Sequence, residues 1–373
     1  MNNELRVVIS GGGTGGHIFP AISIANAIKV LNPEAKILFV GAEGRMEMQR
    51  VPAAGYEIKG LPICGFSRSN KLSNIKVLFK IWKSQRMAKK ILKSFRPMVA
   101  VGVGGYASGP TLNKAASMGI PCLIQEQNSY AGVTNKLLAK KARKICVAYE
   151  GMERFFPADK IIVTGNPVRQ SLLNATLSKS MAVKSFGLDV DKKTILVVGG
   201  SLGARTMNES IMNHLDMVRS HVDDVQFIWQ TGKYYHASIV EKLQGDEPIK
   251  NLHVTDFISD MGAAYRAADL IISRAGASSI SEFCLIGKPV ILVPSPNVAE
   301  DHQTKNAMAL VNRNAALYVK DAEAQDTLLD LALRTVEDDK TLRSLSENIL
   351  KMALPNSAEM IAKEVIKLAE ENR

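Results

Sequence analysis

Residues 7–16 read VVISGGGTGG, and residues 195–204 read ILVVGGSLGA. Each stretch begins with apolar residues typical of a buried parallel strand and continues into a glycine-rich turn and a helical pattern. This strand–turn–helix plan occurs once near the start of each half of the chain. It predicts two doubly wound α/β domains that are joined near residues 165–169.

Further short apolar runs alternate with helical patterns along the whole chain. This alternation predicts parallel sheets with helices on both faces. Ligands of such sheets bind beyond the carboxyl ends of the strands, so we expect a site in a cleft between two facing domains. The predicted strands are residues 5–9, 36–40, 98–104, 121–125, 144–148 and 160–165, followed by 194–200, 225–230, 251–257, 269–273 and 289–294.

The composition favours an ordinary globular protein. The chain has 373 residues, 46% of them hydrophobic, which suffices for two domains with full cores. It has no apolar run long enough to span a membrane and no signal-peptide pattern, so we expect a cytoplasmic protein. Neither the four cysteines nor the six histidines have the spacing of metal ligands. We therefore predict no metal and no cofactor.

The charge is distributed unevenly along the chain. Residues 1–166 contain 24 Lys and Arg against 9 Asp and Glu, whereas residues 167–373 contain 23 against 27. This excess predicts that one surface of the first half faces a polyanion. Nucleic acid fits poorly, because no array of basic and aromatic residues recurs elsewhere.

Residues 70–96 contain nine Lys or Arg and no acidic residue. At about 100° per residue, their apolar side chains form two stripes on opposite faces of a helix. One stripe is predicted to face the core. The other, flanked by lysines, is typical of an interfacial membrane contact, although it could instead pack beneath a loop. The predicted membrane contact consists of Ile75, Leu78, Phe79 and Trp82 with Lys76, Lys80 and Lys83.

The first glycine turn, SGGGTGGHIFP at residues 10–20, ends in His17. Glycines let the backbone approach a phosphate closely, and these satisfy the dinucleotide spacing G-x-G-x-x-G. With Glu43 after the second strand, this pattern leaves a nicotinamide dehydrogenase as an alternative. A dehydrogenase does not explain the basic helix or the second-half turn, and the histidine suggests something other than a cofactor clamp.

A further strand–glycine–helix segment, DLIISRAGASSISEF, covers residues 269–283. Its helix is predicted to begin at Ala277, where backbone N–H groups and serine hydroxyls favour a phosphate. Glu282 could accept hydrogen bonds from a ribose, or it could simply face solvent. The other polar candidates in this half are Ser201, His302 and Gln303.

Seven motifs together resemble those of the MurG family of glycosyltransferases, in that family's order and over most of the chain. The resemblance implies a GT-B fold, in which two Rossmann-like domains face each other across a cleft. The expected domains are residues 1–165 for the acceptor and membrane, 166–350 for UDP-GlcNAc, and a C-terminal helix at 351–373 that packs back on the first domain. The motifs are GGGTGGHIFP (11–20), GGYASGP (104–110), EQNSYAGVTNKLLAK (126–140), GNPVR (165–169), GGSLGAR (199–205), RAGASSISE (274–282) and DHQTKNA (301–307).

The resemblance implies a reaction. N-acetylglucosamine moves from UDP-GlcNAc to the 4-hydroxyl of the MurNAc sugar in lipid I, with inversion, giving lipid II and UDP in peptidoglycan synthesis. The expected location is peripheral, on the cytoplasmic face of the bacterial plasma membrane. The expected partners are UDP-GlcNAc, lipid I, an anionic membrane surface and proteins of wall synthesis. A UDP-GlcNAc 2-epimerase and a non-enzymatic membrane-surface protein remain alternatives.

Inverting transfer needs a base that removes the proton from the acceptor hydroxyl. His17 is our candidate, because an imidazole with an ordinary pKa of about 6.5 suits proton transfer at cytoplasmic pH. Glu126 is the rival, and His17 could instead cap its helix or bind phosphate. The residues implied to face the acceptor or the donor sugar in this half are Thr14, Gly15, Gly16 and Tyr106.

On the donor side, the resemblance implies that the backbone of Ile258 contacts the uracil and that Glu282 holds the ribose. The family often has Gln-Gln where this chain has His302-Gln303, so the role of His302 stays open while Gln303 matches a sugar contact. The other implied contacts are Asn128 to the sugar, Arg169 and Ser201 to the nucleotide, and Ala277, Ser278, Ser279, Ile280 and Ser281 to the phosphates.

Overall fold

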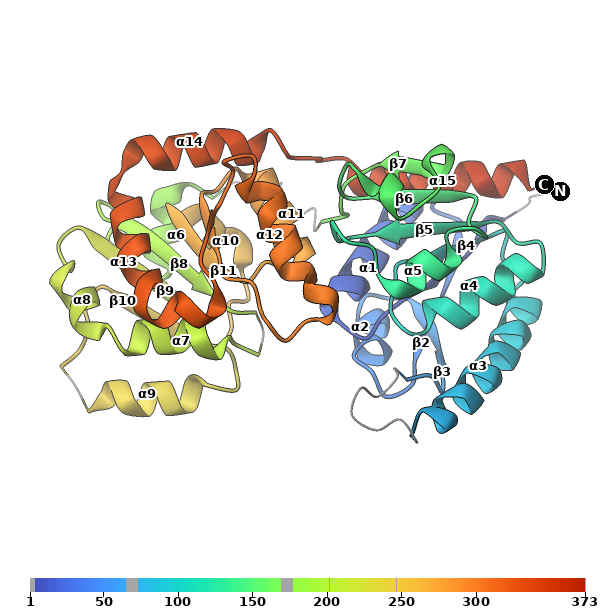
Figure 1. Cartoon of the computed structure of the whole chain (residues 1–373), viewed down its shortest axis with the longest axis horizontal. Helices are drawn as coiled ribbons and strands as arrows, with labels where there is room; N and C mark the ends of the chain where they lie inside the picture. Colours follow the sequence, from blue (N-terminus) through green and yellow to red (C-terminus); the bar gives the residue numbers. More distant parts are fainter. Residues whose placement is uncertain (1–3, 65–72, 169–176, 201, 246, 373) are drawn as a thin grey trace. The chain divides into compact units, whose positions relative to one another are not determined.

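The chain forms two compact units, one made of residues 1–169 and 354–373 and the other of residues 170–353. Each unit contains one parallel sheet with helices on both faces (Figure 1). The doubly wound α/β architecture expected from the sequence is confirmed. The residues described by this computed structural model are 4–64, 73–168, 177–200, 202–245 and 247–372.

The strands of the first unit are β1 (Arg6–Ser10), β2 (Lys36–Ala42), β3 (Glu57–Leu61), β4 (Val99–Gly102), β5 (Cys122–Glu126), β6 (Lys144–Val147) and β7 (Ile161–Val163). They form one parallel sheet in the order β3-β2-β1-β4-β5-β6-β7. The chain moves outward from β1 in one direction and then returns to its other side with β4. The loops after β1 and β4 therefore separate at a switch point, where open parallel sheets usually bind ligands.

Helices cover both faces of this first sheet. Successive strand residues point to opposite faces, so Val7 and Ile9 join one core cluster while Val8 joins the other. Helices α1, α2 and α15 pack on the first of these faces, and α3, α4 and α5 pack on the second. Their bounds are α1 (Gly15–Leu31), α2 (Glu47–Ala53), α3 (Ser73–Phe95), α4 (Ser108–Ser117), α5 (Val133–Leu138) and α15 (Ser357–Glu371).

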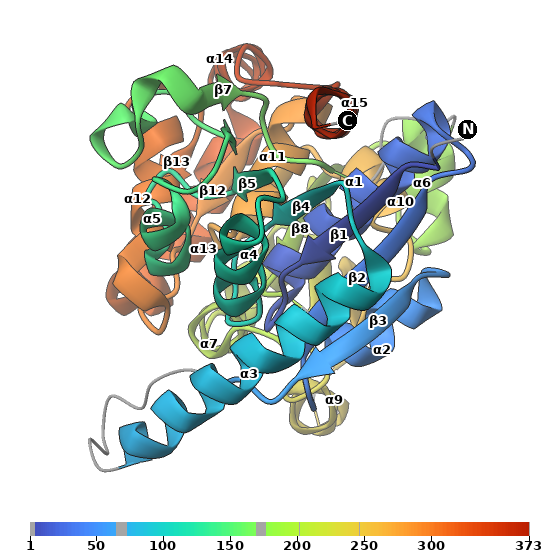
Figure 2. The ribbon, with the colours of Figure 1, turned by 90° about the vertical axis from the view of Figure 1, so that its right-hand side faces the viewer.

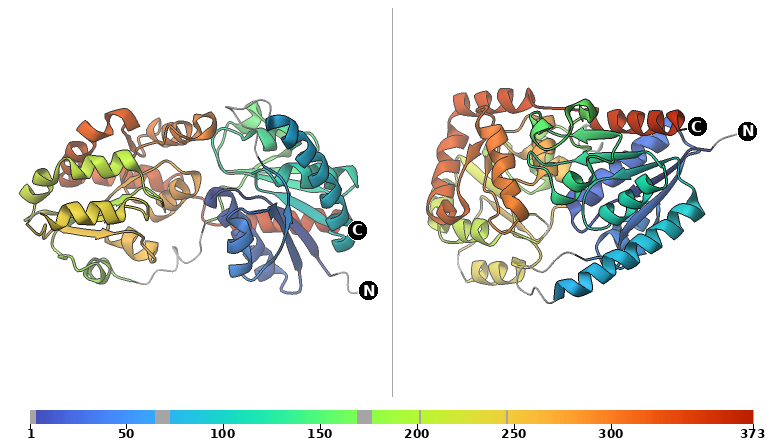
Figure 3. Two further views of the ribbon diagram at one scale, coloured as in Figure 1. Left: turned by 90° about the horizontal axis from the view of Figure 1, so that it is seen from below. Right: turned by 45° about the vertical axis from the view of Figure 1, so that its right-hand side comes forward.

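The C-terminal helix α15 belongs to the first unit, although the whole second unit precedes it in the sequence. Ile361 and Val365 of α15 share a buried cluster with Ile24 and Ile28 of α1. Figure 3 shows this red helix among the blue and green elements of the first unit. The last helix thus completes a core that begins with the first strand.

The second unit repeats the plan. Its strands are β8 (Lys193–Val198), β9 (Val225–Gln230), β10 (Leu252–Thr255), β11 (Leu270–Ser273), β12 (Val290–Leu292) and β13 (Leu317–Tyr318), in the order β10-β9-β8-β11-β12-β13. The switch point here separates the loops that follow β8 and β11. The helices of this unit are α6 (Lys179–Ser185), α7 (Arg205–Met212), α8 (Leu215–Ser220), α9 (His236–Gln244), α10 (Met261–Ala267), α11 (Ala277–Ile286), α12 (His302–Val311), α13 (Ala324–Glu337) and α14 (Asp339–Leu350).

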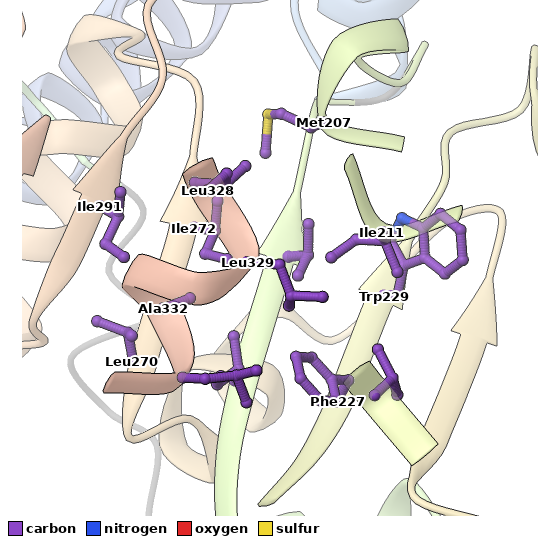
Figure 4. Packing of buried hydrophobic residues seen from close by; sticks show 14 of the residues in the cluster. Met207, Ile211, Phe227, Trp229, Leu270, Ile272, Ile291, Leu328, Leu329 and Ala332 are labelled. Carbon is purple, nitrogen blue, oxygen red and sulfur yellow. The ribbon is translucent and has the colours of Figure 1, made fainter. Parts of the chain in front are cut away.

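One face of the second sheet carries a large apolar core. Figure 4 shows Leu328 and Leu329 of α13 beside strand residues such as Ile272. Trp229 is fully buried in this core, and its indole Nε1 donates a hydrogen bond to Asn208 Oδ1 at 3.0 Å. The one polar atom of this large ring is therefore paired, as burial requires.

Two strands at sheet edges, β3 and β13, are absent from the strands that apolar runs predict. The β3 sequence EIKGL alternates exposed with half-buried residues, and β13 has only two residues. An edge strand is covered less completely than a central one, so a criterion based on continuous apolar residues does not select it. Each sheet consequently has one strand more than the sequence indicates.

The basic segment of the first half forms α3, which Figure 2 shows running beside α4. Within the described residues, no helix has the length and apolarity needed to cross a bilayer.

Candidate functional site

The loop after β1 places the first glycine motif at the switch point of the first sheet. Gly12 and Gly13 have φ angles of +150° and +88°, which residues with side chains disfavour. Helix α1 begins after Thr14, whose carbonyl oxygen accepts hydrogen bonds from the backbone N of His17 and Ile18 at 3.1 Å. The N-terminus of a 17-residue helix thus lies at the carboxyl edge of the sheet, where its first-turn N–H groups favour an anion.

The loop after β4 packs so closely against this first loop that only glycine fits. A Cβ atom on Gly105 would lie 2.3 Å from the carbonyl oxygen of Gly12. A Cβ atom on Gly104 would lie 2.9 Å from Nε2 of His17. The motif GGYASGP therefore brings bare backbone against the histidine ring, and the exposed side chain of Tyr106 follows immediately.

His17 is half-buried, and its Nδ1 lies 3.2 Å from the Thr14 hydroxyl oxygen. If Nδ1 carries the proton, that proton is donated to the Thr14 oxygen and the ring lone pair lies on Nε2. This tautomer is the one that a general base requires. The pairing with Thr14 is therefore compatible with the role predicted for His17.

Glu126, the rival base, ends β5 and is only 2% exposed. Its Oε1 accepts hydrogen bonds from the backbone N and the Nδ2 of Asn128, at 3.1 and 3.3 Å. Its Oε2 accepts from the backbone N of Gly132 at 3.0 Å and from Nδ2 of Asn135 at 2.9 Å. These four bonds occupy the lone pairs that a base would use. The geometry therefore favours a role in holding the loop and the half-buried Asn128.

Two polar features of the first unit are absent from the sequence-based candidates. Gln127 donates to the carbonyl oxygen of Val103 at 2.8 Å, and Asn166 donates to the carbonyl oxygen of Gln127 at 3.0 Å. Gln127 lies in the motif EQNSYAG and Asn166 lies in GNPVR. Their position as polar residues after apolar strands is the sequence signal that could have identified them. The second polar feature that the sequence-based candidates lack is Glu47, a buried acid beneath the first glycine loop. No pattern singles it out, because RMEMQR reads as ordinary surface helix.

In the second unit, the glycine loop after β8 packs against the loop after β9. Gly200 and Gly203 have φ angles of +88° and +87°, and a Cβ atom on Gly203 would lie 2.2 Å from the carbonyl oxygen of Thr231. This close approach explains the spacing of GGSLGAR. The predicted nucleotide contacts Ser201 and Arg169 lie outside the described residues.

The start of α11 follows β11 directly, at the switch point of the second sheet. The hydroxyl of Ser281 donates back to the carbonyl oxygen of Ala277 at 3.0 Å, so it is engaged within the helix. The hydroxyl of Ser278 is buried and has no hydrogen-bond partner among the described residues. The side chain of Ile280 lies in the core, which leaves only its backbone for a ligand. The half-buried residues of this turn are Ala277, Ser278, Ser279 and Ser281.

Glu282 is 5% exposed and accepts a hydrogen bond at 2.8 Å from the hydroxyl of Tyr265. The alternative of a solvent-facing glutamate is therefore wrong. Ile258 is also buried, in the apolar cluster that includes α11. Its side chain belongs to the core, so a contact with a base would have to use its backbone, as expected from the resemblance.

His302 and Gln303 lie in the first turn of α12, beyond the carboxyl end of β12. Oε1 of Gln303 accepts a hydrogen bond from the backbone N of Ser295 at 2.8 Å. This bond orients the carboxamide, whose nitrogen remains a donor. The preceding Glu300 and Asp301 have φ angles of +55° and +52°. This tight left-handed turn leads into the start of α12, where the side chains of His302 and Gln303 lie.

Helix α3 has two apolar faces, as its sequence predicts. Ala88 and Leu92 are buried in the core, whereas Phe79 and Trp82 are 65% and 53% exposed. The guanidinium of Arg86 lies 4.4 Å from the Trp82 ring centroid. Exposure of both rings counts against the alternative in which this stripe packs beneath a loop. Lys80 and Lys83 are also exposed, whereas the side chains of Ile75, Lys76 and Leu78 lie outside the described part of the structure.

The described residues contain no group of three or more His, Cys, Asp or Glu placed to hold a metal ion. Burial raises the pKa of the Cys122, Cys146 and Cys284 thiols to about 12. These thiols therefore stay protonated at neutral pH and do not act as nucleophiles.

Two protein-family models match this chain. The N-terminal domain of glycosyltransferase family 28 matches residues 7–147, and the C-terminal domain of that family matches residues 194–368. The chain belongs to glycosyltransferase family 28. Membership of family 28 favours a glycosyltransferase over the nicotinamide dehydrogenase that the glycine spacing alone allowed.

Known proteins resemble the chain over its full length. A Phocaeicola vulgatus protein named UDP-N-acetylglucosamine--N-acetylmuramyl-(pentapeptide) pyrophosphoryl-undecaprenol N-acetylglucosamine transferase is 69% identical over 375 residues, which cover 100% of this chain and 99% of that protein. The crystal structure of Acinetobacter baumannii MurG has a TM-score of 0.77 at 29% identity and covers 97% of this chain and 99% of its own. The predicted resemblance to the MurG family and the GT-B fold are both confirmed.

The fold alone does not separate the family 28 chain from every alternative. A crystal structure of a UDP-N-acetylglucosamine 2-epimerase has a TM-score of 0.67 at 14% identity and covers 100% of this chain and 98% of its own. That likeness shows a shared fold only. The high identity to the named transferase is what distinguishes the two functions.

Proposed function

We propose that this chain transfers N-acetylglucosamine from UDP-GlcNAc to the 4-hydroxyl of MurNAc in undecaprenyl-diphospho-MurNAc-pentapeptide, lipid I. The products are lipid II and UDP, and the reaction inverts the anomeric carbon. The observation that carries this proposal is the full-length, 69% identity to a relative named for the same transfer. In this proposal, the glycine loops and the start of α11 would supply the groups that such a reaction needs.

On the donor side, we infer that UDP binds at the switch point of the second sheet. The start of α11 would receive the phosphates, aided by the hydroxyl of Ser278, which has no partner among the described residues. Glu282, oriented by Tyr265, would accept hydrogen bonds from the ribose hydroxyls. The oriented carboxamide of Gln303 would donate to the sugar. Arg169 and Ser201 are the further proposed nucleotide contacts.

The helix start would also assist departure of UDP. Negative charge grows on the diphosphate as the bond to the anomeric carbon breaks, and first-turn N–H groups oppose that charge. In this proposal, the helix start and Arg169 stabilise the charge on the diphosphate, so this step needs no metal.

On the acceptor side, we infer that the first glycine loop receives the lipid diphosphate and that His17 acts as the base. The Nε2 lone pair of His17 would take the proton from the 4-hydroxyl as its oxygen attacks the anomeric carbon from the face opposite UDP. The contact between the Thr14 hydroxyl and Nδ1 is compatible with the tautomer that this role requires. The exposed Tyr106 is proposed to position the acceptor, and Asn128, held by Glu126, to contact the donor sugar.

We also propose that the enzyme binds peripherally to the cytoplasmic face of the plasma membrane. The acceptor is anchored there by its polyprenol chain. Exposed Phe79 and Trp82 of α3, with Lys80 and Lys83 beside them, match an interfacial contact with an anionic surface.

The first test is UDP release from UDP-GlcNAc, with and without a lipid I analogue in detergent, followed by mass analysis of the acceptor. Release that requires the analogue, together with an acceptor heavier by one N-acetylhexosamine, is the expected result. Release without the analogue would indicate an epimerase-like or hydrolytic enzyme. Folded protein that binds UDP but never turns over would contradict the assigned acceptor.

A further inference from the structure

Glu47 is a buried acid that the mechanism above does not use. It begins α2, and it is 1% exposed. Its Oε2 accepts a hydrogen bond from the backbone N of Gly13 at 2.9 Å, and its Oε1 accepts one from the backbone N of Ala42 at 3.0 Å. One carboxylate therefore joins the loop that follows β1 to the last residue of β2.

The surrounding backbone is shaped to admit this carboxylate. A Cβ atom on Gly12 would lie 2.2 Å from Oε1 of Glu47, and one on Gly41 would lie 2.6 Å from its Cγ. Both distances are far below ordinary contact, so a side chain at either position would displace the acid. The side chain of Glu47 occupies space that two glycines leave open.

The Gly12–Gly13 peptide lies between Glu47 and Gly105. Its N–H points at Glu47, and in a trans peptide the carbonyl oxygen points the opposite way. That carbonyl, on Gly12, faces Gly105, where a Cβ atom would lie only 2.3 Å away. The Glu47 bond fixes the N–H side of this peptide, and the glycine at 105 leaves space for its carbonyl oxygen. The next residue is Thr14, whose hydroxyl contacts the His17 ring.

We propose that Glu47 is a positioning residue for the transfer reaction, acting through the Gly12–Gly13 peptide on Thr14 and the ring of His17. This inference rests on the proposed function, because it assigns Glu47 to the base of that reaction. Glu47 itself meets neither substrate. Its contribution is to keep the loop in the one arrangement that points the ring of His17 at the acceptor.

The chemistry requires an acid at this position. A carboxylate accepts at both oxygens, whereas a carboxamide accepts at one and presents an NH2 group at the other. Glu47→Gln would therefore leave one buried backbone N–H unpaired and opposed by another donor. Glu47→Asp keeps two acceptor oxygens on a stem one methylene shorter, so it should restore part of the function.

The test compares kcat for E47Q, E47D and the control E43Q, in wild-type and H17A backgrounds. Glu43 lies four residues earlier in the chain and is exposed, so E43Q should match the wild type. E47Q should lower kcat roughly 10- to 100-fold, the equivalent of one buried N–H left unpaired. E47D should lower kcat less than E47Q does. In the H17A background, E47Q should lower kcat less than about threefold. Substitutions that act through the same group have effects that are not additive.

Two further readouts separate positioning from general destabilisation. Amide hydrogen exchange should become faster in the peptide that covers residues 11–17 of E47Q, and UDP affinity, a property assigned to the second unit, should not change. Equal losses from E47Q in both backgrounds would overturn the proposal, as would wild-type kcat in E47Q. If the wild-type chain releases no UDP with a lipid I analogue, the proposed function fails. Wild-type turnover with an unaffected E47Q contradicts the role of Glu47 alone.

Discussion

At the scale of single residues, the candidate site depends on where a few backbone groups point. The ring of His17 lies against Gly104, and its Nδ1 faces the Thr14 hydroxyl, so both neighbours restrict its orientation. Glu126 makes four hydrogen bonds to the loop that follows it. These contrasting environments support the proposal that His17 is the base and that Glu126 holds its loop.

We expect His17→Ala to lower kcat by about 10²- to 10⁴-fold, the usual contribution of a general base. UDP affinity should stay unchanged, because the proposed UDP site lies in the other unit. Steady-state kinetics over a range of pH, with lipid I analogue and UDP-GlcNAc varied in turn, would measure this. A change confined to the acceptor KM would mean that His17 binds the acceptor and is not the base.

Glu126→Gln should leave the pH profile of kcat unaltered. The carboxamide cannot accept all four hydrogen bonds, so the loop at residues 126–132 should loosen and the KM for UDP-GlcNAc should rise through Asn128. Hydrogen exchange in that loop and kinetics from pH 5 to 9, about the range in which histidine titrates, would test this. Disappearance of a titrating limb in the variant, with the limb intact in His17→Ala, would instead identify Glu126 as the base.

Lys288 predicts a pH dependence of stability in the second unit. Burial lowers the pKa of its amino group from 10.5 to about 8. Between these values the unfolded chain binds more protons than the folded one, so the contribution of Lys288 to stability improves as pH rises from 8 to 10.5. The thermal midpoint of the wild type relative to Lys288→Met should therefore increase over this interval. A constant difference between the two would contradict the lowered pKa of Lys288.

At the scale of elements, α3 has one buried apolar face and one exposed apolar face. Its buried face completes the core through Ala88 and Leu92, and its outer face exposes Phe79 and Trp82. An ordinary surface helix has one apolar stripe and a polar remainder. The second stripe, with lysines on the same helix, is the observation on which the proposed membrane contact rests.

The double variant Phe79→Ser, Trp82→Ser should weaken binding to anionic vesicles by roughly 10-fold or more, because two large apolar groups no longer enter the interface. Vesicle sedimentation at several salt concentrations would measure this, and added salt should weaken the wild type as well. Val30→Ser, at an exposed position on α1, serves as the matched control. Unchanged binding of the double variant would contradict a membrane role for the outer face of α3.

At the scale of the whole molecule, sequence order and spatial units differ. The chain leaves the first unit near residue 169 and returns to it near residue 354. The C-terminal helix α15 then packs on α1 in the core of the first unit. The stability of the unit that holds His17 therefore depends on residues at the far end of the chain.

Ile361→Ala should destabilise the first unit by about 2–5 kcal/mol, the usual cost of truncating a fully buried Ile. Met360→Ala, at the neighbouring exposed position, should have little effect. Calorimetry would follow the unfolding of the first unit, and UDP titration would report on the second. Loss of UDP affinity with an unchanged transition of the first unit would mean that α15 serves the other unit.

Much of the fold could be predicted from local pattern. All eleven strands expected from apolar runs are present, because a parallel strand with helices on both faces must be apolar throughout. The edge strands β3 and β13 were not predicted. In β3 exposed and half-buried residues alternate, and β13 has only two residues. Among the site residues, glycines were visible in the sequence because close backbone approach excludes side chains, as the Gly12–Gly105 contact illustrates.

The sequence by itself determined the two strand–glycine–helix units, the basic helix with its second apolar stripe, and the motifs that identify the family. Each of these depends on residues close together in the chain, so composition and spacing carry the information. Only the tertiary structure decided that Glu47 lies beneath Gly13, that Glu126 is engaged by its own loop, and that Tyr265 orients Glu282. Buried polar groups must find partners, and which groups come within hydrogen-bond distance depends on how the whole chain folds.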